Sequence, residues 1–329
     1  MQRQKVLERY EYYKGHYLIS LDATGCFSSH EIHCESCCVK NHKDGSKTYY
    51  HQMLGAVMVH PDEKTVIPLA PEPISKPDGN NKNDCELNAV KRQLASIRRE
   101  HPHLKIIATE DGLFSKAPHI RQLKELEMSY IIGAKPWDHS YLFEFIAPLK
   151  LEEKEEQSQD GKRHQYRFIN DIPLNDSNFD CKVNFLEYTE ISPNGKIQHF
   201  TWVTDILLDS STVSLVMRGG RARWKIENET FNTLKNQGYH FEHNFGHGYK
   251  NLSTVMAMLM FLAFLIDQAQ ETCCAVFQKA FKKAKKRIRL WNRARGIFMH
   301  YFVSSWDDLY SAIAGGTSCY GVKLRVDTS

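Results

Sequence analysis

The sequence lacks an apolar run long enough to cross a membrane. Its longest run without a polar residue spans Val255 to Ile266, whereas a membrane-spanning helix needs about 20 apolar residues. The beginning of the sequence also lacks the pattern of a signal peptide. We therefore expect a cytoplasmic protein with no membrane partner, in which residues 255–266 form a buried core helix.

The nine cysteines show no regular spacing and do not indicate a disulfide scaffold. One pair, Cys34 and Cys37, has the Cys-x2-Cys spacing that can clasp a zinc ion. No second such pair is present, and a structural zinc site needs four ligands. Further potential ligands lie nearby in the sequence, namely His33, Cys38, His42 and His51. Two interpretations stay open: ordinary free thiols, which we favour, or a Zn²⁺ site that fixes the hairpin between the first two strands.

The chain also lacks a strong net charge. Its 43 Lys and Arg against 39 Asp and Glu leave +4 over 329 residues, and 42% hydrophobic content is typical of a soluble globular protein. The basic residues are unevenly placed, because Phe281 to Arg295 contains no acid. Such a segment could lie along a phosphate backbone, and a solvated tail helix is the alternative.

No internal repeat is present, and the hydrophobic pattern divides the first half of the chain into alternating elements. Three strands come first, followed by helix, strand, helix and strand, at 16–25, 49–60, 64–73, 82–101, 104–112, 117–129 and 130–136. A meander followed by alternating helices and strands predicts an α/β fold with a mixed sheet. This order is typical of the ribonuclease-H-like fold.

The pattern changes between residues 149 and 212. A charged loop, "LEEKEEQSQDGKRH", precedes three segments that alternate like strands. We therefore expect a β-rich insertion at 149–212 between the first part of the core, 1–148, and its closing part, 213–270. A basic helical tail follows at 271–329.

Two aspartates stand at the ends of apolar segments that should form central, neighbouring strands. Asp22 follows "LISL" and Asp111 follows "IIATE". Two buried carboxylates repel each other unless a cation lies between them, and carboxylates are the usual protein ligands of Mg²⁺. For either residue alone, a turn cap is the alternative. A third acid, Glu227, lies among many cations in the amphipathic stretch "RARWKIENETFNTLK", residues 221–235.

These residues resemble the DDE transposases of bacterial insertion sequences. The closest resemblance is to the branch with a β-strand insertion and a Tyr-x2-Arg-x3-Glu-x6-Lys third motif, and "RWKIE" is its most specific piece. It spans about Tyr17 to Gln268. It implies two Mg²⁺ (or Mn²⁺) ions held by Asp22, Asp111 and Glu227. It also implies cleavage that frees a 3′-hydroxyl and transesterification into target DNA.

The third motif matches only in part. Arg223 and Glu227 fit its Arg and Glu, whereas Gly220 stands where the motif has Tyr. The motif's Lys falls on Leu234, and the lysine of this chain is one residue later, at Lys235.

Helix geometry favours Glu227 over its rival Glu229 as the third acid. At 100° per residue, Leu234 lies about −20° and Lys235 about 80° from Glu227. A long lysine side chain still reaches the same substrate from there. From Glu229, Lys235 would lie about −120° away.

The resemblance assigns the cations of this helix to DNA. The expected phosphate contacts are Arg221, Arg223, Lys225 and Lys235, and Trp202 is a candidate to stack on an extruded base, with a core tryptophan as the alternative. The implied partners are double-stranded DNA, as element ends and as target, and a second copy of the chain in the DNA complex. The implied location is the prokaryotic nucleoid.

The beginning of the chain departs from the family pattern. Transposases of this branch carry a helical DNA-binding region before the first catalytic strand, but here that strand is predicted to begin at His16. We therefore keep an alternative function, a catalytically silent, truncated remnant that binds DNA or regulates a full-length transposase. A carboxylate-pair glycosidase is disfavoured by the cation-rich third motif.

Overall fold

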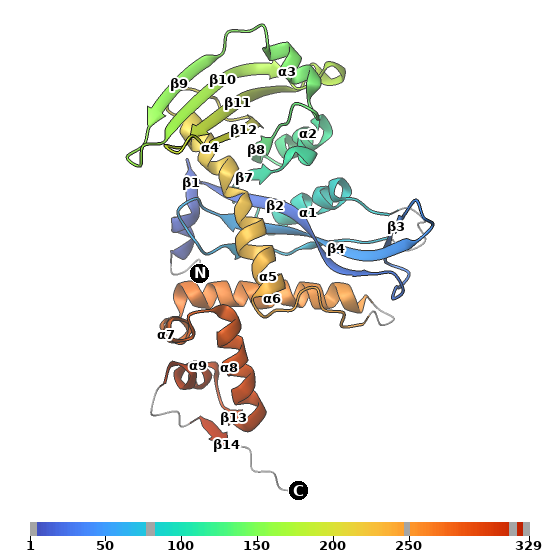
Figure 1. Cartoon of the computed structure of the whole chain (residues 1–329), viewed down its shortest axis with the longest axis vertical. Helices are drawn as coiled ribbons and strands as arrows, with labels where there is room; N and C mark the ends of the chain where they lie inside the picture. The colour runs from blue at the N-terminus through green and yellow to red at the C-terminus, as the bar shows by residue number, and fades with distance from the viewer. Residues whose placement is uncertain (1–4, 77–82, 247–250, 316–320, 325–329) are drawn as a thin grey trace.

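A single twelve-stranded sheet runs through most of the protein. The computed structural model describes residues 5–76, 83–246, 251–315 and 321–324. The strand order is β3-β4-β2-β7-β8-β12-β11-β10-β9, and short β1, β5 and β6 pair with β2 or β4 (Figure 1). The strands are β1 (Glu11–Tyr13), β2 (His16–Ser29), β3 (Cys38–Asn41), β4 (Lys47–Val59), β5 (Ile67–Pro68), β6 (Glu72–Ile74), β7 (Lys105–Glu110), β8 (Ser129–Gly133), β9 (Glu152–Gln157), β10 (Arg163–Pro173), β11 (Lys182–Ile191) and β12 (Ile197–Thr204).

The helices cover both faces of this sheet and form a separate group after it. They are α1 (Glu86–Glu100), α2 (Ala117–Glu125), α3 (Ser140–Ile146), α4 (Val213–Ala222), α5 (Asn232–Asn236), α6 (Leu252–Cys273), α7 (Ala275–Ala284), α8 (Arg287–His300) and α9 (Trp306–Ala314). Short turns are η2 (Val6–Tyr10), η3 (Gly112–Phe114), η4 (Asp176–Asn178) and the π-helical η5 (Ile226–Phe231). A small two-stranded antiparallel sheet, β13 (Tyr301–Val303) with β14 (Val322–Leu324), lies near the end of the chain.

The predicted mixed α/β sheet is confirmed. β2 pairs antiparallel with β4 and parallel with β7, and β7 pairs parallel with β8. The third predicted strand is split into β5 and β6, both of which pair with β4. This arrangement is that of a ribonuclease-H-like core, in which the ends of β2 and β7 lie side by side at the centre of the sheet.

The alternation of apolar residues along the strands creates a core on each face of the sheet. On β2, Ile19 packs in the core beneath α1 and α2, whereas its neighbour Leu18 packs in the core beneath α4 and α6. Such two-sided burial explains the nearly continuous apolar run in this strand.

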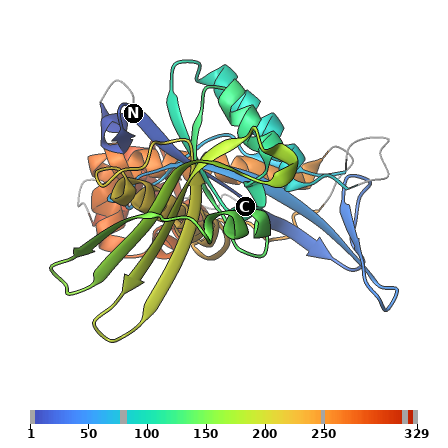
Figure 2. The same cartoon turned by 90° about the horizontal axis from the view of Figure 1, so that it is seen from above.

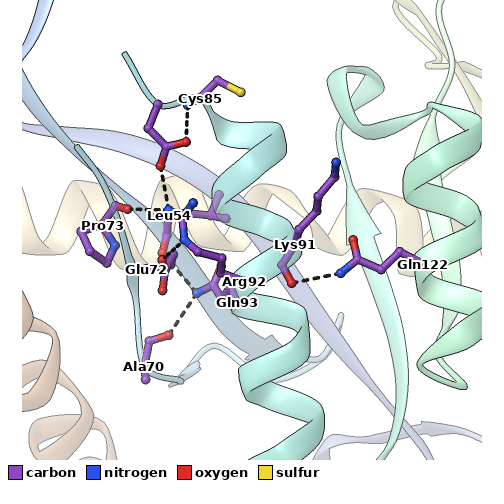
Figure 3. Close-up of polar contacts among 10 residues, drawn as sticks. Leu54, Ala70, Glu72, Pro73, Cys85, Lys91, Arg92, Gln93 and Gln122 are labelled. Atoms are coloured by element: carbon purple, nitrogen blue, oxygen red, sulfur yellow. Dashed lines mark hydrogen bonds and ion pairs between the residues drawn. The ribbon is translucent and has the colours of Figure 1, made fainter. Parts of the chain in front are cut away.

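Helix α1 is attached to the sheet margin by polar contacts (Figure 3). Gln93 donates from its Nε2 to the carbonyl oxygens of Leu54 on β4 and Ala70, at 3.2 and 3.0 Å. Arg92 donates at 2.7 Å to the carboxylate of Asp84, which precedes the helix. The bonds of Gln93 hold α1 to β4 and to Ala70, and the bond of Arg92 holds the segment before α1 to the helix.

The predicted β-rich insertion extends the core sheet instead of forming a separate one. β12 pairs antiparallel with β8, and β11, β10 and β9 follow outward. Seen from above, these strands and the β3–β4 hairpin project in different directions (Figure 2). The expected charged loop is partly wrong, because its first residues form edge strand β9. A charged edge strand discourages pairing with other chains.

A single interrupted helical segment crosses one face of the sheet. In Figure 1, α4 and α5 run in line from the insertion strands to α6, and η5 lies between them. Glycines allow this close approach: a Cβ on Gly219 would lie 2.8 Å from Cδ1 of Ile131, and one on Gly55 of β4 would lie 2.9 Å from Cε1 of Phe231. A Cβ on Gly220 would overlap the indole of Trp202.

The core helix expected at 255–266 is present, but only one side of it is buried. The helix, α6, has 22 residues, and 33% of its most apolar window is buried. Its length and composition are those of a membrane-spanning helix, and no other helix among the described residues shares them. One side, with Phe261 and Phe264, packs against the sheet, whereas Leu259 and Leu262 are exposed.

The basic tail predicted at 271–329 is a packed unit in its described part. Helices α7, α8 and α9 share a core around Phe277, Leu290 and Tyr310. Arg287 is buried and pairs with Glu271, so it is not available to DNA. Exposed cations are nevertheless numerous on α7 and α8, including Lys282, Lys283, Arg289 and Arg293.

We predict that Gly220→Ala destabilises the protein, because the new methyl group must displace Trp202. Overpacking of this kind costs about 1–3 kcal/mol, which denaturant unfolding would detect. Gly296→Ala on α8 is the matched control, since a Cβ there meets no atom within 4 Å. Trp202→Phe should restore part of the stability of the Gly220→Ala protein. Equal stability of Gly220→Ala and the natural protein would contradict this packing.

Candidate active site

Asp22 lies just beyond the point where β2 and β7 stop pairing. The parallel register ends at Ser20 with Thr109, whereas the antiparallel register with β4 continues to Ser29 and places Asp22 opposite Gly55. The expected strand end at Asp22 is therefore wrong, because the long partner β4 keeps β2 extended. Asp22 still occupies the end of the central parallel pairing.

Asp111 follows directly after β7, as predicted. It is the N-cap residue of η3, and its Oδ1 accepts a hydrogen bond of 2.9 Å from the backbone N of Leu113. The preceding residue, Glu110, is buried and binds Nε2 of His119 at 2.6 Å. Strand alternation thus separates the two neighbouring acids: Glu110 is used within the core, and the half-exposed Asp111 is available to a ligand.

Arg223 brings Glu227 to Asp22. Its Nη1 lies 3.1 Å from Oδ2 of Asp22 and 2.9 Å from Oε1 of Glu227. The two carboxylate oxygens are therefore separated by at most the sum of these distances. The side chains of Arg223 and Asp22 are largely buried, whereas that of Glu227 is 36% exposed. The contact between Arg223 and Asp22 is therefore screened less by water than a surface ion pair.

The three acids influence one another electrostatically. The pKa of Asp22 is raised from 3.8 to about 7. Burial is the main cause; the positive charge of Arg223 lowers the pKa, and the negative charges of Glu227 and Asp111 raise it. One guanidinium therefore does not compensate the carboxylates fully. A site of this kind favours an additional cation.

The structure separates Glu227 from its rival Glu229. Glu227 binds Arg223 and acts on the pKa of Asp22. Glu229 instead lines a cavity of about 470 Å³ between η5 and the residues that follow α7. Glu227 thus shares a site with Asp22, and Glu229 faces elsewhere.

The π-helical turn changes the direction expected for Lys235. A π-helical turn accommodates one residue more than an α-helical turn. The buried side of this helical segment consists of Ile226, Phe231 and Leu234. Glu227 directly follows Ile226 in the sequence, and Lys235 directly follows Leu234. The expected separation of about 80° between Glu227 and Lys235 assumed an unbroken α-helix, and the π-helical turn interrupts that helix. The role of Lys235 beside Glu227 stays a prediction.

The other cations of the third motif have protein partners. Arg221 binds the carboxylate of Glu190 at 2.8 Å and lies over the ring of Phe200. Lys225 donates to the carbonyl oxygen of Glu63 at 2.7 Å. Lys235 pairs with Glu242, which is exposed, at 2.8 Å.

A cleft of about 380 Å³ opens beside Asp111. Residues of β12, α4 and the segment after β8 line it, among them Lys135, Trp137, His199, Trp202, Arg221 and Trp224. Trp202 is 5% exposed and stacks on Phe200, with 5.6 Å between ring centroids. This packing corresponds to the core alternative, and base stacking by Trp202 stays a prediction. Trp137 is 76% exposed, and Lys135 lies over its ring. The sequence did not identify Trp137 as a site residue, because the segment "AKPWDHS" that contains it has no recognisable motif.

The carboxylates of Asp22, Asp111 and Glu227 lie farther apart than the ligands of a single bound metal ion. In the described part of the chain, one group of His, Cys, Asp or Glu residues has three potential ligand atoms within 4.8 Å of one another. This group is Cys34, Cys37 and His51. Asp22, Asp111 and Glu227 thus do not all meet this distance. Their joint metal binding stays a prediction.

A family model described as the transposase DDE domain matches residues 27–266. This is well over half of the chain. The chain belongs to the transposase DDE domain family. The match includes Asp111, the insertion strands and Glu227, and it begins shortly after Asp22. No curated protein matches the chain.

Asp22 should make the stability of this transposase domain depend on pH. Its pKa is higher in the folded than in the unfolded chain, so the folded state binds the proton more tightly. The free energy of unfolding therefore falls as pH rises from about 4 to about 7. We predict that Asp22→Asn raises this free energy at pH 8, by on the order of 1–3 kcal/mol, and has little effect near pH 4.

Chemical denaturation at both pH values would measure the difference. Asp44→Asn is the matched control, because hydrogen bonds from Ser46 lower the pKa of this exposed residue, so its replacement should not stabilise the protein at pH 8. A loss of stability in Asp22→Asn at pH 8 would mean that Arg223 compensates the charge completely.

Proposed function

We propose that this transposase domain catalyses metal-dependent DNA strand cleavage and strand transfer of an insertion sequence, with Asp22, Asp111 and Glu227 as its catalytic carboxylates. The main support is the shared binding of Asp22 and Glu227 by Arg223. That contact joins residues far apart in sequence at the end of the central strand pairing, next to Asp111.

The carboxylates fit divalent cations such as Mg²⁺ or Mn²⁺. The supporting observation is the raised pKa of Asp22, to which burial contributes most and the charges of Glu227 and Asp111 contribute further. Bound at these three residues, two such ions supply charge stabilisation to the attacking and leaving oxygens of an in-line phosphodiester displacement.

The protein's own side chains position this chemistry. Arg223 orients Asp22 and Glu227, and it leaves less of its charge for phosphate than the sequence suggested. Lys235 is bound to the exposed Glu242, so DNA phosphate can replace that partner. Arg221 is bound to the buried Glu190 and is itself partly exposed, so it would contact phosphate while it keeps this partner. The cleft beside Asp111, with Trp137 and Trp224 exposed at its walls, would receive the DNA near the cleaved bond.

The biological setting belongs to the same proposal. Double-stranded DNA would be bound as element ends and as target, with two copies of the chain in the complex, at the prokaryotic nucleoid. A catalytically silent remnant would retain DNA binding and lack cleavage. Mn²⁺-dependent nicking of duplex DNA distinguishes these two functions.

We predict that Asp22→Ala, Asp111→Ala and Glu227→Ala each abolish Mn²⁺-dependent strand cleavage while the chain stays folded. Each replacement removes one carboxylate from the group around Arg223. Gel analysis of a supercoiled plasmid would measure nicking, and circular dichroism would verify folding.

The matched control is Glu229→Ala, two residues away on the same helical segment and facing the other cavity. It should retain cleavage. If Glu229→Ala is inactive and Glu227→Ala is active, our assignment of the third acid is wrong. Absence of nicking by the natural protein would favour the silent remnant.

DNA binding by this chain should be mostly electrostatic. Its exposed cations on α7 and α8, together with Arg221 and Lys235, contact phosphate and carry no base information. We predict that log affinity falls steeply with log salt, and that Lys282→Ala with Lys283→Ala weakens binding to all sequences about equally. Fluorescence anisotropy at two salt concentrations, with an end-derived and a scrambled duplex, would measure this. A preference for the end sequence above about 10³-fold would show that a recognition element lies within the chain.

A further inference from the structure

We propose that Cys34, Cys37 and His51 form a structural zinc site that fixes the arm made by β2, β3 and β4. The site lies outside the acidic active site and is independent of the proposed reaction. Cys34 and Cys37 belong to the loop between β2 and β3, and His51 lies on β4 opposite Phe27.

The distances among the three donor atoms are those of a tetrahedral zinc ion. The two Sγ atoms are 3.7 Å apart, and Nε2 of His51 lies 3.4 Å from Sγ of Cys34 and 3.2 Å from Sγ of Cys37. Zn–S bonds of about 2.3 Å at tetrahedral angles place two sulfurs about 3.8 Å apart and a sulfur and an imidazole nitrogen about 3.5 Å apart. The three donors thus already surround one point.

The surroundings favour a metal over a packed pair of thiols. Cys37 and His51 are 1% and 3% exposed, so an ion bound there is shielded from water. Two thiolates balance the charge of Zn²⁺, which leaves no net charge to bury. The backbone N of Cys34 donates a hydrogen bond of 3.3 Å to Sγ of Cys37, which ties the two ends of the Cys-x2-Cys turn together.

The other ligands suggested by the sequence do not join this site. Sγ of Cys38 points to the carbonyl oxygen of Ile74, and Nε2 of His42 binds the hydroxyl of Thr48 at 2.7 Å. The ring of His33 stacks on Tyr49. Cys34, Cys37 and His51 therefore provide three ligands, and a tetrahedral zinc ion takes one more, from water or another group of the protein.

The site connects two parts of the fold that border the active site. It ties the loop after β2 to β4 only four residues before Gly55, the partner of Asp22. The same loop reaches α6, because Ser36 donates to the side chain of Asn251, its N-cap residue, at 3.1 Å. Zinc would thus hold the arm, and with it the strand that carries Asp22, in one position.

Metal content and spectroscopy of the full chain test this proposal. The purified protein should contain about one zinc per chain, and Cys34→Ser, Cys37→Ser and His51→Ala should each reduce that content severalfold. Cys85→Ser is the matched control, since Cys85 is an exposed cysteine at the beginning of α1, and it should keep its zinc. Zinc content that is unchanged in Cys37→Ser would overturn the proposal.

Two measurements on the natural sequence protect the test against variants that fail to fold. Co²⁺ added to the zinc-depleted chain should give the intense visible bands of tetrahedral coordination and a sulfur-to-metal charge-transfer band. Alkylation followed by mass spectrometry should modify Cys85 at once, and Cys34 and Cys37 only after a chelator is added. Absence of the cobalt bands, or immediate alkylation of Cys34 and Cys37, would show that they are ordinary thiols.

Discussion

One nitrogen of Arg223 binds both Asp22 and Glu227, and this contact defines how the helical segment must lie on the sheet. For the guanidinium to reach β2, the segment from α4 to α5 must approach the strands more closely than ordinary side chains allow. Gly219, Gly220 and Gly55 provide that approach, since a Cβ at any of them would contact a neighbouring side chain at or below van der Waals distance. The ring of Phe231 and the indole of Trp202 fill the space that the glycines leave.

The acidic site reduces the stability of the fold that carries it. Ionisation of the buried Asp22 beside two other acids costs free energy in the folded state, which is why its pKa rises to about 7. A core that served folding alone would use an apolar residue here. Uncompensated charge of this kind is typical of functional sites, and ligand cations of the kind proposed would remove the repulsion.

The sequence was sufficient to predict the order of the core elements and the position of Asp111, because apolar runs that end in an acid mark strand ends directly. The sequence was insufficient where the length or existence of a strand depends on pairing with a distant strand. The length of β2 beyond Asp22 depends on β4, and edge strand β9 depends on β10, although its own residues are nearly all charged. The buried Arg287 was predicted as part of a DNA-binding surface, since its partner Glu271 lies on a different helix.

The third motif shows how a local irregularity escapes sequence analysis. An ideal helix puts Lys235 away from Glu227, and nothing in the residues between them signals a π-helical turn. The turn becomes visible only in the packing of Ile226 and Phe231, which are five residues apart and both lie against Gly55. Likewise, His51 is one of several nearby histidines in the sequence, and the pairing of β2 with β4 selects it as the neighbour of Cys34 and Cys37.

The central claim is that Asp22, Asp111 and Glu227 act together on one cluster of metal ions. Anomalous diffraction from crystals of the protein with Mn²⁺ and a DNA duplex tests it most directly. The account predicts manganese peaks within coordination distance of all three carboxylates, no manganese at Glu229, and Arg223 still in contact with Asp22 or Glu227. Manganese bound at Glu229, or at none of the three acids in a crystal that contains DNA, would contradict it.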